Sequence, residues 1–184
     1  MGKCTALEAA RYLIYLMSDS FDDLSNMKIN KLLYYAQGQC LLKNGYPLFD
    51  DKIEAWQHGP IVESVYQAFK GYESAPIPAE SGSDCAEMDE EAKDLLFDVA
   101  RVYGRYTASA LRNMTHRVGT PWERVYDSGS LHVEIPQSMI LEYFKKKEKP
   151  IEPVTIPEDE MEFVGYRDKE GYLVLPQEWA DEAV

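Results

Sequence analysis

Hydrophobic residues recur at the three- and four-residue spacing of α-helices from the start of the chain to about Lys147. The first predicted helix carries its apolar residues at Leu7, Ala10, Ile14 and Met17. Thr5 and Glu8 precede them as a capping box, which places the helix N-terminus at this point.

Similar start signals predict further helices in the second half of the chain. Asp89 is the expected N-cap of a long helix, and Thr107 or Ser109 begins a shorter one. Thr120 is followed by Pro121 in the first turn of another helix, and the last helix runs from about Pro136 to Lys147. Together with the segment described next, these signals predict a compact bundle of about six helices.

The segment from Met27 to Tyr72 contains two predicted helices around one short strand. Its first helix has an apolar stripe at Ile29, Leu32, Leu33, Ala36 and Cys40. A second stripe beside it is polar and aromatic, and it consists of Lys28, Lys31, Tyr35 and Gln39. We expect the apolar stripe to face the core and the polar stripe to be free for contact with a partner. The alternative is an ordinary solvated helix face.

A corner follows that helix. Asn44-Gly45 is a helix stop, and the run from Ile53 to Trp56 reads as a strand. His58-Gly59-Pro60 is expected to open a second helix, with proline early in the first turn. Trp56 and Tyr66 are expected to bury apolar area across this corner, and Gly59 permits a close backbone approach.

The tail differs in composition from the helical part. Pro150, Pro153 and Pro157 break helices and favour an extended linker from Glu148 onward. Two β-prone runs then follow, Phe163 to Tyr166 and Tyr172 to Leu175, and they are joined by a charged turn that ends in glycine. A hairpin alone is marginal in water, so we expect these strands to form a small antiparallel sheet with the strand near Trp56. The rival interpretation is a tail that orders only when it adds a strand to a partner.

The sequence therefore predicts a mainly α fold, with a helical bundle and a small antiparallel β element made of the short strand near Trp56 and the C-terminal hairpin. Two domains are expected. Residues 1–147 form the helical domain, and residues 148–184 form an acidic linker and a β-hairpin extension.

The charge balance bounds the possible partners. The chain has 32 acidic and 19 basic residues and a formal net charge of −13. Such a charge opposes binding to a phosphate backbone, so no direct nucleic-acid partner is expected. A basic protein partner would be attracted, although the charge can equally serve solubility. No run is apolar enough for a signal peptide or membrane span, so a cytoplasmic protein without a membrane partner is expected.

No pattern of catalytic or metal-binding residues is found. The chain has three cysteines, Cys4, Cys40 and Cys85, and their spacing matches neither a disulfide framework nor a zinc site. Cys40 lies on the apolar stripe and is interpreted as a buried thiol, and His58 is interpreted as a structural or contact residue. Phosphate-binding glycine loops are missing as well. We therefore expect a protein that is not an enzyme, with no catalytic residue, metal or cofactor.

Several of these motifs resemble a known family. The run from Lys28 to Tyr35, the turn from Gly45 to Phe49, and Trp56-Gln57-His58-Gly59-Pro60 followed by Val65-Tyr66 are similar to the SocA-like domain, also called the Panacea domain. The similarity continues through Pro121-Trp122 and through Ile140 to Phe144, and it covers roughly residues 5–147. The C-terminal hairpin lies outside it.

The resemblance implies an antitoxin in a type II-like toxin–antitoxin system, of a kind associated with phages. Its implied partner is a cognate toxin encoded beside it, which it neutralises by direct binding. On this basis Lys28, Lys31, Tyr35 and Gln39 are the candidate contact residues, and Trp56, His58, Gly59, Pro60 and Tyr66 are the scaffold of the motif.

Other functions remain open at this point. The protein can be an adaptor that delivers the toxin to a Clp protease, which would make the protease a second partner. It can also be a phage-encoded inhibitor or a DNA-binding regulator, although the acidic charge opposes the last of these.

Overall fold

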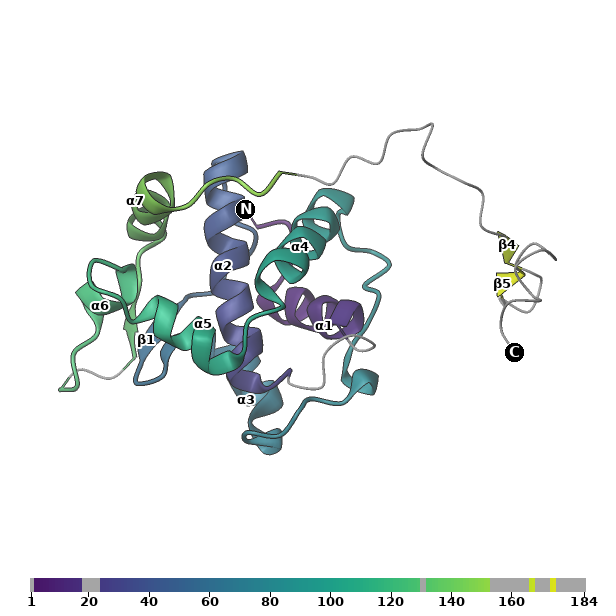
Figure 1. The fold of residues 1–184 in the computed structure, drawn as a ribbon, viewed down its shortest axis with the longest axis horizontal. Coiled ribbons are helices and arrows are strands. Elements are labelled where there is room, and N and C mark those ends of the chain that lie inside the picture. Colours follow the sequence, from purple (N-terminus) through teal and green to yellow (C-terminus); the bar gives the residue numbers. More distant parts are fainter. Residues whose placement is uncertain (1, 18–23, 130–131, 153–165, 168–172, 175–184) are drawn as a thin grey trace. The chain divides into compact units, whose positions relative to one another are not determined.

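The computed structural model describes residues 2–17, 24–129, 132–152, 166–167 and 173–174. The chain divides into two compact units, Met1–Glu152 and Pro153–Val184. The described part of the first unit holds seven α-helices and a three-stranded sheet, which confirms the mainly α fold (Figure 1).

Seven helices form most of the described part of the first unit. They are α1 (Ala6–Met17), α2 (Asn26–Asn44), α3 (Glu63–Phe69), α4 (Glu90–Tyr103), α5 (Ala108–Thr115), α6 (Pro121–Val125) and α7 (Gln137–Lys147). Two single 3-10 turns, Lys70–Tyr72 and Ala79–Ser81, lie between α3 and α4.

The expected capping residues begin four of these helices. Thr5 and Glu8 form the capping box of α1, since the Glu8 carboxylate accepts from Thr5 N at 2.8 Å and Glu8 N donates to Thr5 Oγ1 at 3.2 Å. Asp89, Thr107 and Thr120 accept a first-turn amide of α4, α5 and α6 in the same way.

Helix α2 is the central element of the first unit. It contacts α1, α3, α4, α5, α7 and strand β2 (Gly59–Ile61), and it passes through the middle of the helices in Figure 1. Its two ends are well defined, because Ser25 caps the first turn and Gly45 adopts a left-handed conformation with φ of 77°. A helix with neighbours on every side has no solvated face, which explains why most of its polar residues are buried.

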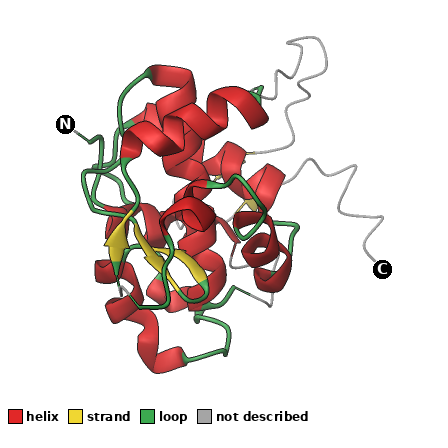
Figure 2. Ribbon diagram, turned by 90° about the vertical axis from the view of Figure 1, so that its left-hand side faces the viewer, coloured by secondary structure: helices red, strands yellow, loops and turns green. Residues whose placement is uncertain are grey.

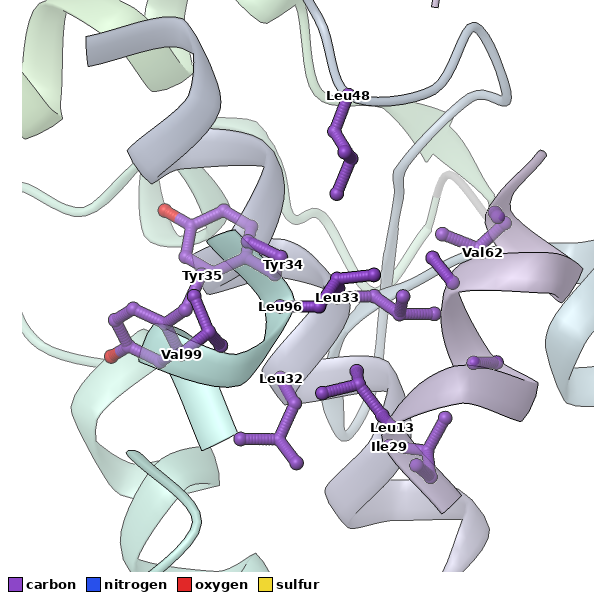
Figure 3. Close-up of a cluster of buried hydrophobic side chains, with 14 of the residues drawn as sticks. Leu13, Ile29, Leu32, Leu33, Tyr34, Tyr35, Leu48, Val62, Leu96 and Val99 are labelled. Carbon is purple, nitrogen blue, oxygen red and sulfur yellow. The ribbon is translucent and has the colours of Figure 1, made fainter. Parts of the chain in front are cut away.

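The hydrophobic core forms around α2. Side chains from three parts of the chain converge on α2 (Figure 3). They are Leu13 of α1, Leu96 and Val99 of α4, and Leu48 and Val62 of the segment between α2 and α3. On α2 itself the labelled core residues are Ile29, Leu32, Leu33, Tyr34 and Tyr35. The core thus includes both the predicted apolar stripe and a member of the stripe that was expected to face solvent.

The sheet has the strand order β2-β1-β3 and is antiparallel throughout (Figure 2). Its strands are β1 (Glu54–Trp56), β2 (Gly59–Ile61) and β3 (Val133–Glu134). Trp56 pairs with Gly59, so Gln57 and His58 are the two residues of a tight hairpin turn.

The expected helix start at His58-Gly59-Pro60 is wrong, because these residues complete a hairpin instead. Gly59 has φ of 104°, which no helix start uses. Pro60 can occupy a strand because β2 is at the edge of the sheet, where a residue without an N–H costs no ladder bond. The second helix of this segment, α3, begins only at Glu63.

The expected sheet between the C-terminal hairpin and the strand near Trp56 is also not found. Both edges of β1 are already occupied, by β2 and by β3. Strand β3 pairs Val133 with Ala55, a pairing that the sequence analysis did not predict. In the second unit, β4 (Tyr166–Arg167) and β5 (Leu173–Val174) pair with each other in antiparallel register, and the remaining residues of the predicted hairpin lie outside the described ranges.

Residues 148–152 belong to the first unit and contact its helices. Gln39 Nε2 donates to Lys149 O at 3.1 Å, and Ile151 N donates to Gln39 Oε1 at 3.2 Å. The Tyr103 hydroxyl donates to Glu148 at 3.1 Å. Burial raises the pKa of the Glu148 carboxyl above its ordinary value, although the hydrogen bond from Tyr103 opposes this change.

Candidate functional site

Buried polar side chains of α2 hold the corner segment in place through its backbone. Asn26 Nδ2 donates to Tyr66 O at 3.0 Å, and Val62 N donates to Asn30 Oδ1 at 2.8 Å. Lys31 Nζ donates to Pro60 O at 2.9 Å. Gln37 binds Leu48 N, Phe49 N and Phe49 O at 3.0 to 3.2 Å. Each bond satisfies a backbone group that burial would otherwise leave without a partner.

The four residues expected on a free face of α2 are all buried. Their exposed fractions are 1% for Lys28, 0% for Lys31, 3% for Tyr35 and 1% for Gln39. The prediction of a solvent-facing polar stripe is therefore wrong, because α4, α5 and α7 and the strap of residues 148–152 cover that side of the helix.

Each of these side chains has an internal contact. Tyr35 stacks on Tyr103 with ring centroids 4.1 Å apart, and Gln39 binds the strap as described above. Lys28 also takes part in a polar, ring or electrostatic interaction. Burial raises the pKa of Tyr35 far above its ordinary value, so its hydroxyl stays protonated.

Lys31 is the least usual of the four because its ammonium group has no carboxylate partner in the described residues. Complete burial, assisted by the positive charge of Arg112, lowers the pKa of Lys31 from 10.5 to about 7. Gly59 lies directly against it, since a methyl group at Gly59 would be 2.6 Å from Lys31 Cε. The glycine of the corner thus provides space for the buried lysine.

Aromatic rings build the outer side of the same corner. Trp56 contacts Tyr66 with ring centroids 4.8 Å apart and stacks on His132 at 4.0 Å. Trp56 Nε1 donates to Glu54 at 2.9 Å, and Trp56 O accepts from Trp122 Nε1 at 2.8 Å. Trp56 is therefore fixed from several sides and forms a rigid wall.

A groove of about 1070 Å³ lies beside this wall, between the corner and helices α2, α3 and α5. The corner and α3 contribute Trp56, Gln57, His58, Ile61, Tyr66 and Lys70. The starts of α2 and α5, with the loop after α3, contribute Ser25, Asn26, Met27, Glu73, Ser74, Pro76, Thr107, Ala108, Ser109 and Arg112. The groove thus includes three of the predicted scaffold residues, Trp56, His58 and Tyr66, whereas Gly59 and Pro60 lie buried behind it.

The α5 side of the groove was missed by the sequence analysis. Thr107 was recognised as a helix cap, but no pattern indicated that this helix end lies beside Trp56. Arg112 follows Ala108 by four residues and Ser109 by three, so these three residues lie on the same side of α5. That spacing was the one available signal, and it gains meaning only after α5 has been placed against α2 and β2.

Burial also shifts the pKa values of two cysteines and of a histidine. Burial raises the pKa of Cys40 to about 11 and that of Cys4 to about 12, so both remain protonated thiols near neutral pH. His116 packs on Trp122 and has Nδ1 2.7 Å from Arg112 O, and burial lowers its pKa. In the described residues, no group of three or more His, Cys, Asp or Glu side chains is placed to hold a metal ion. The described helices include none that is both long enough and apolar enough to cross a bilayer.

The first unit is a small, mainly helical domain with a groove beside Trp56. The family model for the antitoxin SocA-like, Panacea domain matches residues 29–123, which include most of α2, the corner and all of α5. The chain belongs to this family. It is 33% identical over 110 residues to the antitoxin SocA of Caulobacter vibrioides (strain NA1000 / CB15N), an alignment that covers 54% of this chain and 58% of that relative. No solved structure matches the chain.

Proposed function

We propose that this protein is an antitoxin that binds a partner toxin directly and thereby neutralises it. The observation that carries this proposal is the family match over residues 29–123, because that span contains the central helix, the corner and the α5 wall of the groove. The name of its relative, antitoxin SocA, supports the same role. A non-catalytic role agrees with the buried, protonated thiols of Cys4 and Cys40.

The partner is proposed to be a protein encoded beside this chain. The test is co-expression of each neighbouring reading frame with and without this protein, followed by purification on a tag at Met1. We expect one neighbour to stop growth alone, to permit growth with this protein, and to co-purify with it. If no neighbour is toxic, or if a toxic neighbour stays toxic, the proposal fails.

A pair of variants tests whether rescue in that assay depends on the folded protein. Leu32→Asp places a charge at a position that is 0% exposed and is expected to abolish both the fold and the rescue. Lys145→Asp changes an exposed residue of α7 and is expected to leave both unchanged. Rescue that depends on a Clp protease, with disappearance of the toxin and no stable complex, would instead identify a proteolytic adaptor.

The second unit is proposed to be a separable extension. The first compact unit ends at Glu152, whose backbone oxygen accepts a hydrogen bond from Arg101 Nη2 at 2.9 Å. The helical unit is therefore expected to fold without residues 153–184, and their role in neutralisation is tested by the same growth assay on a chain that ends at Glu152.

A further inference from the structure

The groove beside Trp56 carries positive charge on an acidic protein. Its charged lining residues are Lys70, Arg112 and Glu73, whereas the whole chain has a formal net charge of −13. Neither Lys70 nor Arg112 has a carboxylate within ion-pair distance in the described part of the chain, although other lysines and arginines do. Arg112 donates to Asn113 Oδ1 at 3.4 Å, a neutral partner that leaves its charge uncompensated.

Two further features add to this positive potential. The starts of α2 and α5 both border the groove, through Ser25 to Met27 and through Thr107 to Ser109. A helix N-terminus carries a partial positive charge, and here two such ends face the same space. Lys31 lies behind the wall and is close enough to Arg112 for their charges to repel each other. Of the described residues that line the groove, Glu73 is the one acidic residue.

The rest of the lining is apolar or aromatic. Trp56 and Tyr66 present ring surface, and Met27, Ile61 and Pro76 add aliphatic surface. Glu73 has φ of 52° and ψ of −112°, a backbone conformation that an L-residue rarely adopts, and it lies where the loop after α3 meets the groove. With about 1070 Å³, the groove is at the upper end of the range for small-molecule sites and can accommodate several residues of a peptide.

From this combination we infer that the groove binds an acidic segment of the partner protein, with carboxylates that meet Arg112 and Lys70 and a neighbouring apolar or aromatic side chain that packs on Trp56 and Tyr66. This inference rests on the proposed function, because it assigns the partner-binding surface of the antitoxin. An acidic segment is repelled by most of this protein and attracted here, so the charge pattern also fixes where and in which direction the segment binds. A guanidinium group suits a carboxylate particularly well, since it can donate two parallel hydrogen bonds.

Blocking the groove tests the inference without disturbing the core. Ser109→Trp places a large ring in the groove from an exposed position, the second residue of α5. Ser138→Trp is its matched control, because Ser138 is also exposed and is the second residue of α7, away from the groove. Both variants are expected to unfold in urea at midpoints close to that of the unmodified protein.

The probe is a random peptide library displayed on phage, selected on the full-length protein and counter-selected on Ser109→Trp. We expect the groove-dependent peptides to be rich in Asp and Glu next to aromatic or aliphatic residues. Their affinity should fall about tenfold or more in Arg112→Glu and in Lys70→Glu, and should stay within about twofold in Lys43→Glu, which reverses an exposed lysine elsewhere. The inference is overturned if the groove-dependent peptides are basic or uncharged, or if every selected peptide still binds Ser109→Trp. Displacement of the peptides by a single-stranded oligonucleotide would overturn it as well.

The growth assay then distinguishes this inference from the proposed function. If the unmodified protein and Ser138→Trp neutralise the toxin and Ser109→Trp does not, both stand. If Ser109→Trp neutralises equally well, the protein is an antitoxin that uses another surface, and the inference fails alone. If no toxin is neutralised, the proposed function fails, and the peptide selection still decides whether the groove is an acidic-peptide site.

Discussion

Lys31→Met replaces a completely buried amine by an apolar side chain of similar length. The pKa of Lys31 is about 7 in the folded protein and 10.5 in its ordinary state. At pH values between about 7 and 10.5, Lys31 binds a proton in the unfolded chain that it does not bind in the folded chain. The free energy of unfolding therefore rises with pH across this range, and it falls toward pH 7 as the buried amine becomes charged.

The size of this effect follows from the two pKa values. One proton of difference changes the free energy of unfolding by about 1.4 kcal/mol per pH unit. Because the amine is already half charged near pH 7, the rise from about pH 7 to about pH 8.5 is smaller, roughly 1.5 kcal/mol in total. Lys31→Met has no such group, so this part of the pH dependence should disappear.

Urea unfolding followed by tryptophan fluorescence measures the effect at several pH values in this range. The lowered pKa of His116 lies below this range. The thiols of Cys4 and Cys40 have raised pKa values in the folded protein and begin to ionise in the unfolded chain near the top of the range. Their contribution is the same in Lys31→Met, so it cancels in the comparison of the two proteins. Lys43→Met is the control, because Lys43 is exposed on the same helix. If the curves of Lys31→Met and the unmodified protein stay parallel, Lys31 is charged in the folded state and the reasoning is refuted.

Three other changes test the packing around α2. Gly38→Ala should lower the free energy of unfolding by about 1–3 kcal/mol in urea, since a methyl group there overlaps the Phe144 ring. Adding Phe144→Leu should restore part of the loss, whereas a stabilised Gly38→Ala would contradict this packing. Gly59→Ala should cost about 2 kcal/mol or more, because φ is 104° and Lys31 fills the space, so an unchanged urea midpoint would argue against the described corner. A chain that ends at Lys147 should be less stable by about 1–2 kcal/mol in thermal unfolding than a chain that ends at Glu152, because it lacks the hydrogen-bond partners of Gln39 and Tyr103. Equal melting temperatures would show that the strap of residues 148–152 contributes nothing.

Local signals predicted the helices well because their causes are local. Thr5 with Glu8, Asp89, Thr107 and Thr120 each mark a helix start through a hydrogen bond that spans two or three residues. These bonds depend on the neighbouring sequence alone, so they can be read from it.

The environment of α2 was misread because helical periodicity cannot distinguish a solvated polar stripe from one that is covered by other elements. Lys31 and Gln39 look like surface residues in sequence, yet their partners are Pro60, Lys149 and Ile151, which are far away along the chain. The same limit applies to the groove, whose walls come from four separate segments, and to β3, which is only two residues long.

The corner was misread for a different reason. Proline after glycine fits either the first turn of a helix or an edge strand, and the local sequence permits both. The pairing of Ala55 with Pro60 decides between them, and the pairing of Ala55 with Val133, which is distant in the sequence, completes the sheet.

The hydrogen bonds from α2 to its surroundings end mostly on backbone atoms, as at Pro60 O, Val62 N and Lys149 O. A bond to a peptide group does not depend on which side chain that residue carries. The segments that wrap α2 can therefore exchange their outward-facing residues freely while the same few side chains of α2 keep them in place. Such a domain separates the residues that maintain its shape from those that meet a partner, so its recognition surface can be redesigned, by selection or by engineering, with little loss of stability.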